Sequence, residues 1–183
     1  MAITTFAAID IGSYEVSMKI FELSKKIGFR QLSDVRYRLE IGKGAYSSGR
    51  LEPEVVDAIC GILKDFDKMM KEFGVSDYRA CATSAFREMV NPLIVQEQIY
   101  RRTGIHVEIL SNAEQHFLGY NSIAAKESSF KKMIQKGTAI LDVGGGGLQV
   151  SLFDKDALVT TQSLKMGSMR IRERLKELEK TTT

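Results

Sequence analysis

The chain has 183 residues, of which 44% are hydrophobic and 27% charged, with a formal net charge of +3. This composition excludes a wholly disordered chain and suits a folded protein of one domain or somewhat more. The charges are interspersed, which does not indicate nucleic-acid binding, and neither a membrane helix nor a signal peptide is expected, so we predict a cytoplasmic protein.

Short apolar runs at the start of the chain predict three strands joined by turns, over 4–11, 16–23 and 29–41. A loop rich in glycine and serine is expected over 42–49. Apolar residues every three to four positions then predict a long amphipathic helix over 53–73. The next predicted elements are a strand at 78–82, a helical turn at 84–89, a helix at 92–102, a strand at 106–110 and a helix at 112–126.

The opening of the chain repeats 132 positions later, where Ile140–Gly145 resembles Ala8–Ser13 and Asp142 matches Asp10. Strands are predicted again, at 138–143, 148–153 and 158–164, followed by a helix at 168–179. A repeated β-β-β-α start indicates two similar lobes. We therefore expect a first lobe over residues 1–130 and the beginning of a second over 131–183, as in a fragment.

Each repeat places an aspartate at the end of a strand and glycines directly after it. Glycines let the backbone turn sharply and bring N–H groups close to an anion. An aspartate at such a turn is a natural partner for hydrated Mg²⁺. Two loops of this kind facing each other across a cleft would hold a phosphate chain, whereas the simpler alternative is two ordinary hairpin turns.

The segment Ala82–Arg87 lies where a strand meets a helix and allows two interpretations. Thr83, Ser84 and Arg87 would bind an anion, or a hydroxyl would cap the helix and the arginine would be solvated. Further along, Ser111 and Glu114 have the spacing of a helix capping box.

The two cysteines and two histidines do not indicate a disulfide or a metal site. Cys60 and Cys81 lie in apolar patterns and are expected to be free thiols in a reducing compartment. His106 and His116 share no metal-ligand spacing, and both are expected to be structural or exposed.

Four segments resemble, in order and spacing, the exopolyphosphatase / guanosine pentaphosphate phosphohydrolase (Ppx/GppA) family: Ala8–Ser13, Ala82–Arg87, Val107–Ser111 and Leu141–Gly146. Gly49–Leu51 and Met166–Arg170 also fit. The resemblance covers essentially the whole chain. It implies an α/β fold with a ribonuclease H-like lobe of the actin, sugar kinase and chaperone superfamily, and the opening of a second, incomplete lobe.

The resemblance also implies removal of terminal phosphate from polyphosphate or guanosine pentaphosphate with Mg²⁺. By position, Asp10 and Asp142 match the family's metal-loop aspartates. The implied phosphate-binding residues are Gly12, Ser13, Thr83, Ser84, Arg87, Gly144, Gly145 and Gly146.

The two glutamates that the family uses for catalysis are replaced in this chain. The position of the water-activating glutamate is Gln115, and that of the second glutamate is Gln149. An amide cannot act as a base, and loss of a positioned base typically costs about 10²–10⁴-fold in rate. Glu15 is a candidate substitute. Glu114 is a poor one, because one step along a helix turns a side chain by roughly 100°.

Three functions therefore stay open: an exopolyphosphatase-like hydrolase, a catalytically weak module that binds an anion or nucleotide and regulates, and a kinase-like or actin-like nucleotide-binding protein. The hydroxyl and arginine segment at Thr83–Arg87 disfavours the third. Exposed apolar residues of an incomplete second lobe, Leu148, Val150 and Leu152, also lead us to expect a partner or a homodimer.

Overall fold

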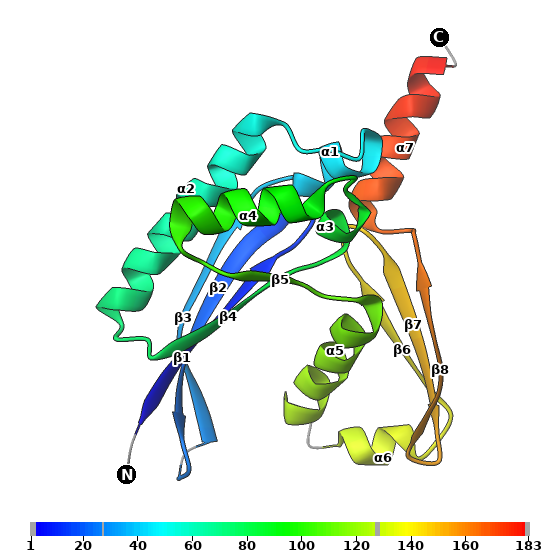
Figure 1. Ribbon diagram of the computed structural model, residues 1–183. Helices are drawn as coiled ribbons and strands as arrows, with labels where there is room; N and C mark the ends of the chain where they lie inside the picture. The colour runs from blue at the N-terminus through cyan, green and yellow to red at the C-terminus, as the bar shows by residue number, and fades with distance from the viewer. Residues whose placement is uncertain (1–2, 27, 127–128, 182–183) are drawn as a thin grey trace. The chain divides into compact units, whose positions relative to one another are not determined.

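The structure is a computed structural model that describes residues 3–26, 28–126 and 129–181. It has two compact units, Met1–Ile109 and Leu110–Thr183, with a five-stranded sheet in the first and a three-stranded sheet in the second (Figure 1). The segment after residue 109 thus groups with the second sheet. The lobe boundary at residue 130 stays a prediction about the repeat.

The sheet of the first unit has the strand order β3-β2-β1-β4-β5. β1, β2 and β3 are an antiparallel meander, while β4 and β5 run parallel to β1. Parallel neighbours need long crossovers, which the helices between them provide. This arrangement confirms the expected ribonuclease H-like lobe. The strands are β1 (Thr4–Ile11), β2 (Glu15–Ser24), β3 (Gly28–Arg38), β4 (Asp77–Ala82) and β5 (Val107–Ile109).

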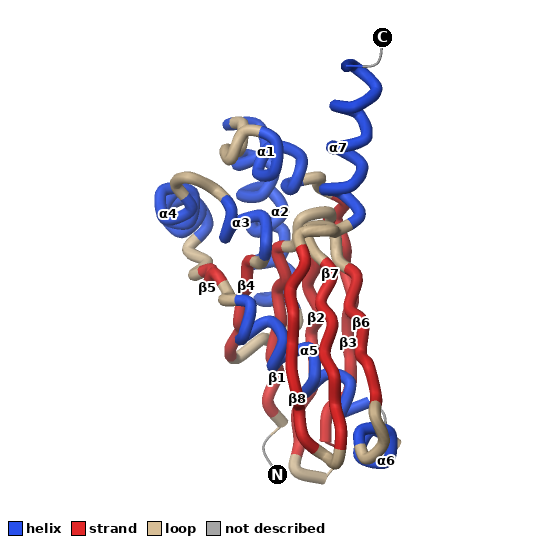
Figure 2. The backbone as a smooth tube through the Cα atoms, turned by 90° about the vertical axis from the view of Figure 1, so that its right-hand side faces the viewer, coloured by secondary structure: helices blue, strands red, loops and turns tan. Residues whose placement is uncertain are grey.

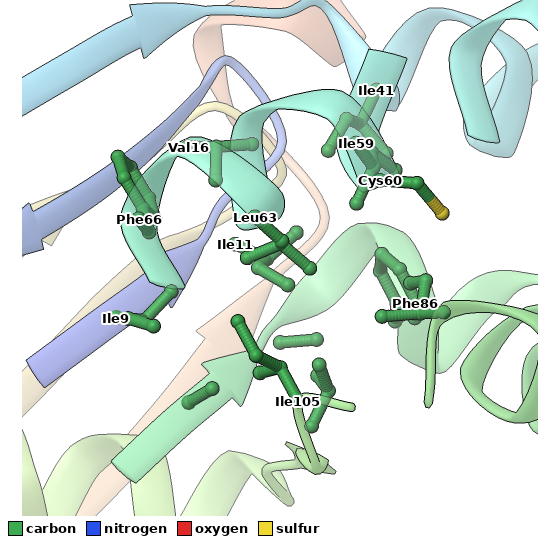
Figure 3. Close-up of a cluster of buried hydrophobic side chains, with 14 of the residues drawn as sticks. Ile9, Ile11, Val16, Ile41, Ile59, Cys60, Leu63, Phe66, Phe86 and Ile105 are labelled. Atoms are coloured by element: carbon green, nitrogen blue, oxygen red, sulfur yellow. The ribbon is translucent and has the colours of Figure 1, made fainter. Parts of the chain in front are cut away.

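The helices of this unit are α1 (Ile41–Ser47), α2 (Pro53–Glu72), α3 (Ser84–Glu88) and α4 (Pro92–Thr103). The long helices α2 and α4 cover one face of the sheet (Figure 1). Alternate strand residues point at them, so Ile11 and Val16 pack with Leu63 and Phe66 in a fully buried core (Figure 3). The period of two in the strands and of 3.6 in α2 accounts for this core.

The prediction of a loop over 42–49 is wrong, because helix α1 occupies most of this segment. The N–H of Gly42 donates to the Ser13 carbonyl at 2.8 Å, and Ile41 and Ala45 are buried four residues apart. Glycine lowers helix propensity, and this hid the helix in the sequence. Tertiary packing on the turn after β1 stabilises α1 nevertheless.

The second unit contains an antiparallel meander in the order β6-β7-β8, which Figure 2 shows along its length. Its elements are α5 (Asn112–Lys126), α6 (Phe130–Ile134), β6 (Thr138–Val143), β7 (Leu148–Asp154), β8 (Ala157–Leu164) and α7 (Ser168–Thr181). The short helix α6 was not predicted. The ring of its Phe130 packs edge-on against Phe153 of β7, with the ring centroids 6.1 Å apart.

The internal repeat is present in the backbone hydrogen bonds of both units. Asp10 pairs with Ser17 across β1 and β2, and Asp142 pairs with Gln149 across β6 and β7. The turn after β1 closes with a hydrogen bond from Gly12 N to the Glu15 carbonyl at 2.9 Å, and the turn after β6 closes with one from Gly144 N to the Gly147 carbonyl, also at 2.9 Å. The two hairpins therefore have the same register.

The repeats differ in how their apolar faces are covered. Ile9 and Ile11 of β1 are 2% and 0% exposed, because α2 and α4 pack over them. Their counterparts on β6, Leu141 and Val143, are 62% and 67% exposed. The face that forms the core of the first unit is thus solvent-accessible in the second.

Candidate functional site

Three hydroxyl groups meet at the turn that follows β1. Ser13 lies in the turn and is buried, Tyr46 comes from α1, and Ser84 begins α3. The Ser13 Oγ lies 2.5 Å from the Tyr46 Oη and 3.0 Å from the Ser84 Oγ, and the last two atoms are 2.9 Å apart. The fold thus brings together two sequence candidates that are far apart in the chain. It adds Tyr46, which the sequence did not indicate.

The sequence does not indicate Tyr46, because the glycines and serines around it predict a loop. Its ring lies over Gly42, where an added Cβ would be only 2.6 Å from the Tyr46 Cε2 and 3.1 Å from the Ser13 Cβ. A larger residue at position 42 would displace the ring. In a helix, residues four apart lie on the same face, so Gly42 leaves room for the ring of Tyr46.

Arg87 lies half-buried on α3, three residues after Ser84 and within electrostatic range of Tyr46. Burial lowers the pKa of its guanidinium, while the nearby Tyr46 and Glu88 act in the opposite direction. The side chain stays cationic, because arginine titrates far above neutral pH. Thr83 N donates to the Ile11 carbonyl at 3.3 Å, which holds the start of α3 at the end of β1. Although Thr83 is at the N-cap, its side chain makes no capping hydrogen bond to the described helix.

Asp10 is the last residue but one of β1. Burial, and then the charge of Glu15, raise the pKa of Asp10 to about 6, although part of the residue surface is solvent-accessible. Glu15 itself accepts a hydrogen bond from Arg36 at 3.3 Å. A carboxyl of raised pKa beside a second carboxylate is a place where a cation would relieve repulsion. The geometry leaves Glu15 paired rather than poised alone as a base.

The glycine turn after β6 is held by the first residues of α7. Ser168 N donates to the Gly144 carbonyl and Met169 N to the Gly145 carbonyl, both at 3.0 Å. Since C=O and N–H point in opposite directions across a trans peptide, the N–H groups of Gly145 and Gly146 point away from α7. Successive N–H groups pointing to one side form an anion-binding concavity.

Asp142, Gln149 and Ser163 form a row across the second sheet. Asp142 pairs with Gln149, and Gln149 pairs with Ser163, so the three side chains share one face. The Ser163 Oγ lies 3.0 Å from the Nε2 of His116 on α5. Gln115, the other predicted catalytic position, is the residue before His116 and is half-buried.

Glu114 is engaged at the start of α5. Ser111 N donates to its carboxylate at 2.8 Å, and Glu114 N donates to the Ser111 Oγ at 3.2 Å. These two bonds confirm the capping box. The Glu114 carboxylate therefore accepts a backbone N–H at the start of the helix.

The cysteines and histidines lie largely as expected. Cys60 is buried, Cys81 is partly buried, and both are free thiols. His106 is exposed and its ring stacks on Tyr100 at 3.9 Å between centroids. His116 is buried and hydrogen-bonded.

Two features of the described residues bear on the expected metal and membrane partners. Within 3–26, 28–126 and 129–181, no three His, Cys, Asp or Glu side chains gather in a cluster able to hold a metal ion. Over the same residues, every helix is too short or too polar to cross a membrane. Magnesium is usually bound by one or two carboxylates together with substrate phosphates, so Asp10 beside Glu15 fits such a site better than a protein-only cage.

The chain is similar to proteins of one family. A model of the Ppx/GppA phosphatase family matches residues 20–180. Exopolyphosphatase 2 of Mycobacterium tuberculosis is 25% identical, over 95% of this chain and 56% of its own length. The chain therefore spans about half the length of this curated relative.

Two solved structures show the same fold. An exopolyphosphatase from Cytophaga hutchinsonii has a TM-score of 0.82 at 23% identity, over 93% of this chain and 53% of that one. The Ppx/GppA family member of Aquifex aeolicus has a TM-score of 0.74 at 22% identity, over 98% of this chain and 62% of that one. The similarity thus extends over both units.

Proposed function

Because the chain belongs to the Ppx/GppA phosphatase family, we propose that it binds the terminal phosphates of polyphosphate as an exopolyphosphatase-like protein. The observation that carries this proposal is the cluster of Ser13, Tyr46 and Ser84 hydroxyls together with the half-buried Arg87. Hydroxyl and guanidinium hydrogens are suitable donors to phosphate oxygens. Guanosine pentaphosphate offers the same terminal group and is the alternative ligand.

A second group of phosphate donors is expected at the turn after β6. The N–H groups of Gly145 and Gly146 point away from α7, and a phosphate there would accept from both. That the two loops face each other across a cleft stays a prediction. Thr83 is proposed to contribute its hydroxyl at the first loop, where it makes no capping bond to the described helix.

We propose Mg²⁺ as the metal, held by Asp10 in the first unit and by Asp142 in the second. When bound with phosphate, Mg²⁺ would neutralise charge on the phosphoryl oxygens. The raised pKa of Asp10 supports this choice, because a cation would favour the charged carboxylate. Protons should compete with the metal as the pH falls towards about 6.

Hydrolysis is proposed to be weak. The positions expected to bear the catalytic glutamates carry the amides of Gln115 and Gln149, and Glu114 is held in a capping box. A second candidate function follows from the same observation, namely a regulatory module that binds the phosphate chain without turning it over.

We also propose that the chain is cytoplasmic and that it self-associates. The apolar face of the second sheet, with Leu141, Val143 and Leu152 exposed, favours contact with another polypeptide, and we propose a homodimer. Light scattering of the purified chain would give the mass directly. A monomer at micromolar concentration would refute the dimer and leave the phosphate site unaffected.

The test of the phosphate site is the affinity of the full chain for polyphosphate, measured by titration calorimetry with Mg²⁺. Arg87→Ala should weaken binding at least several-fold, because a charge-assisted hydrogen bond is lost. Arg101→Ala is the control, since Arg101 is exposed on α4 and pairs with Glu97. Equal affinity of the wild type and Arg87→Ala would remove Arg87 from the site.

Phosphate release from polyphosphate and guanosine pentaphosphate separates the two candidate functions. The double variant Gln115→Glu, Gln149→Glu should release phosphate roughly 10²–10⁴-fold faster than the wild type, because it restores two carboxylates. Binding without any release by either protein would favour the regulatory function.

A further inference from the structure

His116 is a buried imidazole that the proposed phosphate site does not use. The residue is 5% exposed, and it reaches from α5 to the outermost strand β8. Its Nδ1 lies 2.7 Å from the Thr161 Oγ1 and its Nε2 lies 3.0 Å from the Ser163 Oγ. Both nitrogens thus face hydroxyl groups of exposed residues on one strand.

The surrounding hydroxyls can accommodate the tautomer of the ring that carries its hydrogen on Nδ1, and the hydroxyl of Tyr120 also contacts that of Ser151. Tyr120 OH donates to the Thr161 Oγ1 at 3.4 Å, and the Thr161 and Ser151 hydroxyls are 3.1 Å apart. A threonine hydroxyl has one hydrogen and two lone pairs. When Thr161 donates its hydrogen to Ser151, its lone pairs accept from Tyr120 and from Nδ1–H of His116. The Nε2 of His116 then carries the lone pair and accepts the hydrogen of Ser163.

Ser163 and His116 lie at the end of the second sheet that carries the glycine turn after β6, Gly144–Gly147. Ser163 is the cross-strand neighbour of Gln149, which is the neighbour of Asp142. The following residue, Leu164, places its carbonyl 3.0 Å from where a Cβ on Gly147 would lie. The exposed Ser163 hydroxyl therefore lies on the strand that contacts the turn, on the same sheet face as Asp142 and Gln149.

We propose that Ser163 and His116 accept the proton of the water that attacks a phosphate at the Gly144–Gly147 turn. The inference rests on the proposed function, because it needs phosphate bound there. A hydroxyl paired with an imidazole whose other nitrogen is held by a third group is an arrangement that makes the hydroxyl a better proton acceptor or nucleophile. Imidazole is neutral and basic near pH 7, where an amide is not.

The proposed step hydrolyses the terminal phosphoanhydride bond. The water oxygen forms a bond to the terminal phosphorus, and the bond from that phosphorus to the bridging oxygen breaks. The electron pair leaves with the shortened chain. The water proton passes to the Ser163 Oγ as the Ser163 hydrogen passes to the His116 Nε2, and the imidazolium then returns a proton to solvent. Ser163 meets the water, and His116 is a positioning residue that acts through it.

The experiment compares Mg²⁺-dependent phosphate release by the full chain with polyphosphate affinity measured by calorimetry. His116→Gln retains an amide that reaches Ser163 but cannot take a proton, and Ser163→Ala removes the exposed hydroxyl. Thr160→Ala is the control, because Thr160 is exposed on β8 opposite Leu152, off this row. Circular dichroism verifies that each variant is folded.

We expect slow release by the wild type and roughly 10²-fold lower kcat in His116→Gln and Ser163→Ala, with KM and affinity unchanged. The double variant should be no slower than either single one, because the two residues act as a unit. Unchanged kcat in both single variants, or additive losses, would overturn the pair. Binding without release by the wild type would also overturn it and leave phosphate binding standing, whereas absence of binding would refute the proposed function itself.

Discussion

Asp10→Asn tests whether the end of β1 is built for a cation rather than for stability alone. The carboxyl of Asp10 has a pKa raised from 3.8 to about 6, first by burial and then by Glu15. The folded state therefore holds this proton more tightly than the unfolded state. Between about pH 4 and pH 6, the stability that the bound proton contributes to the folded state is lost as the pH rises. Above about pH 6 the charged carboxylate lowers the free energy of unfolding by a constant amount.

The magnitude follows from the two pKa values. A rise from 3.8 to about 6 corresponds to about 3 kcal/mol if nothing screens the group. Because part of the Asp10 surface is exposed, solvent screening reduces this to roughly 1–2 kcal/mol. Asparagine has a similar shape and no charge, so Asp10→Asn should stabilise the first unit by about that amount at pH 7.5 and by almost nothing below pH 4.

The assay is urea unfolding followed by far-ultraviolet circular dichroism from pH 4 to pH 8, since the chain has no tryptophan to report by fluorescence. The difference between wild type and variant removes the titration of the other carboxyl groups. Addition of Mg²⁺ at pH 7.5 should stabilise the wild type and have a smaller effect on Asp10→Asn. In a Glu15→Gln background the gain from Asp10→Asn should shrink, because one cause of the raised pKa is absent.

A wild-type protein that is more stable than Asp10→Asn at pH 7.5 without metal would refute this reasoning. It would mean that hydrogen bonds to the charged carboxylate outweigh its burial. A difference that does not change between pH 4 and pH 7 would show that the substitution acts through packing rather than through charge.

Two further substitutions test the framework that holds the loops. Gly167→Ala should destabilise the second unit by about 1–3 kcal/mol in thermal unfolding. The added Cβ would lie 2.3 Å from the Gly145 carbonyl oxygen and would break the hydrogen bonds between α7 and the turn. Gly137→Ala is the control, because a Cβ at position 137 meets nothing within 4 Å. Leu63→Ala should cost about 2–5 kcal/mol in urea unfolding, because Leu63 is fully buried on the face of α2 that packs on the sheet, and a loss below 1 kcal/mol would show that the site collapses without a cavity.

Much of the fold was predictable because its signals are local. The apolar spacing of α2 and the alternation in β1 and β2 are properties of neighbouring residues, and the elements observed begin and end close to the predicted positions. The repeat around Asp10 and Asp142 was visible as well, since two similar turns need similar residues. The capping box at Ser111 and Glu114 needs only the spacing of three residues on one helix.

Other features depend on residues that are distant in sequence, and only the tertiary structure decided them. Helix α1 forms because the turn after β1 accepts its N–H, and packing of this kind overrides the low helix propensity of glycine. The meeting of Tyr46 with Ser13 and Ser84 depends on that helix.

The sequence by itself determined which residue types are available for chemistry: aspartates and glycines at both turns, and amides at Gln115 and Gln149. It left His116 as an ordinary histidine. Only the pairing of β7 with β8, and the packing of α5 on that sheet, placed its two nitrogens against hydroxyl groups from residues more than forty positions away. Proton affinity and reactivity are set by such surroundings, which local sequence does not encode.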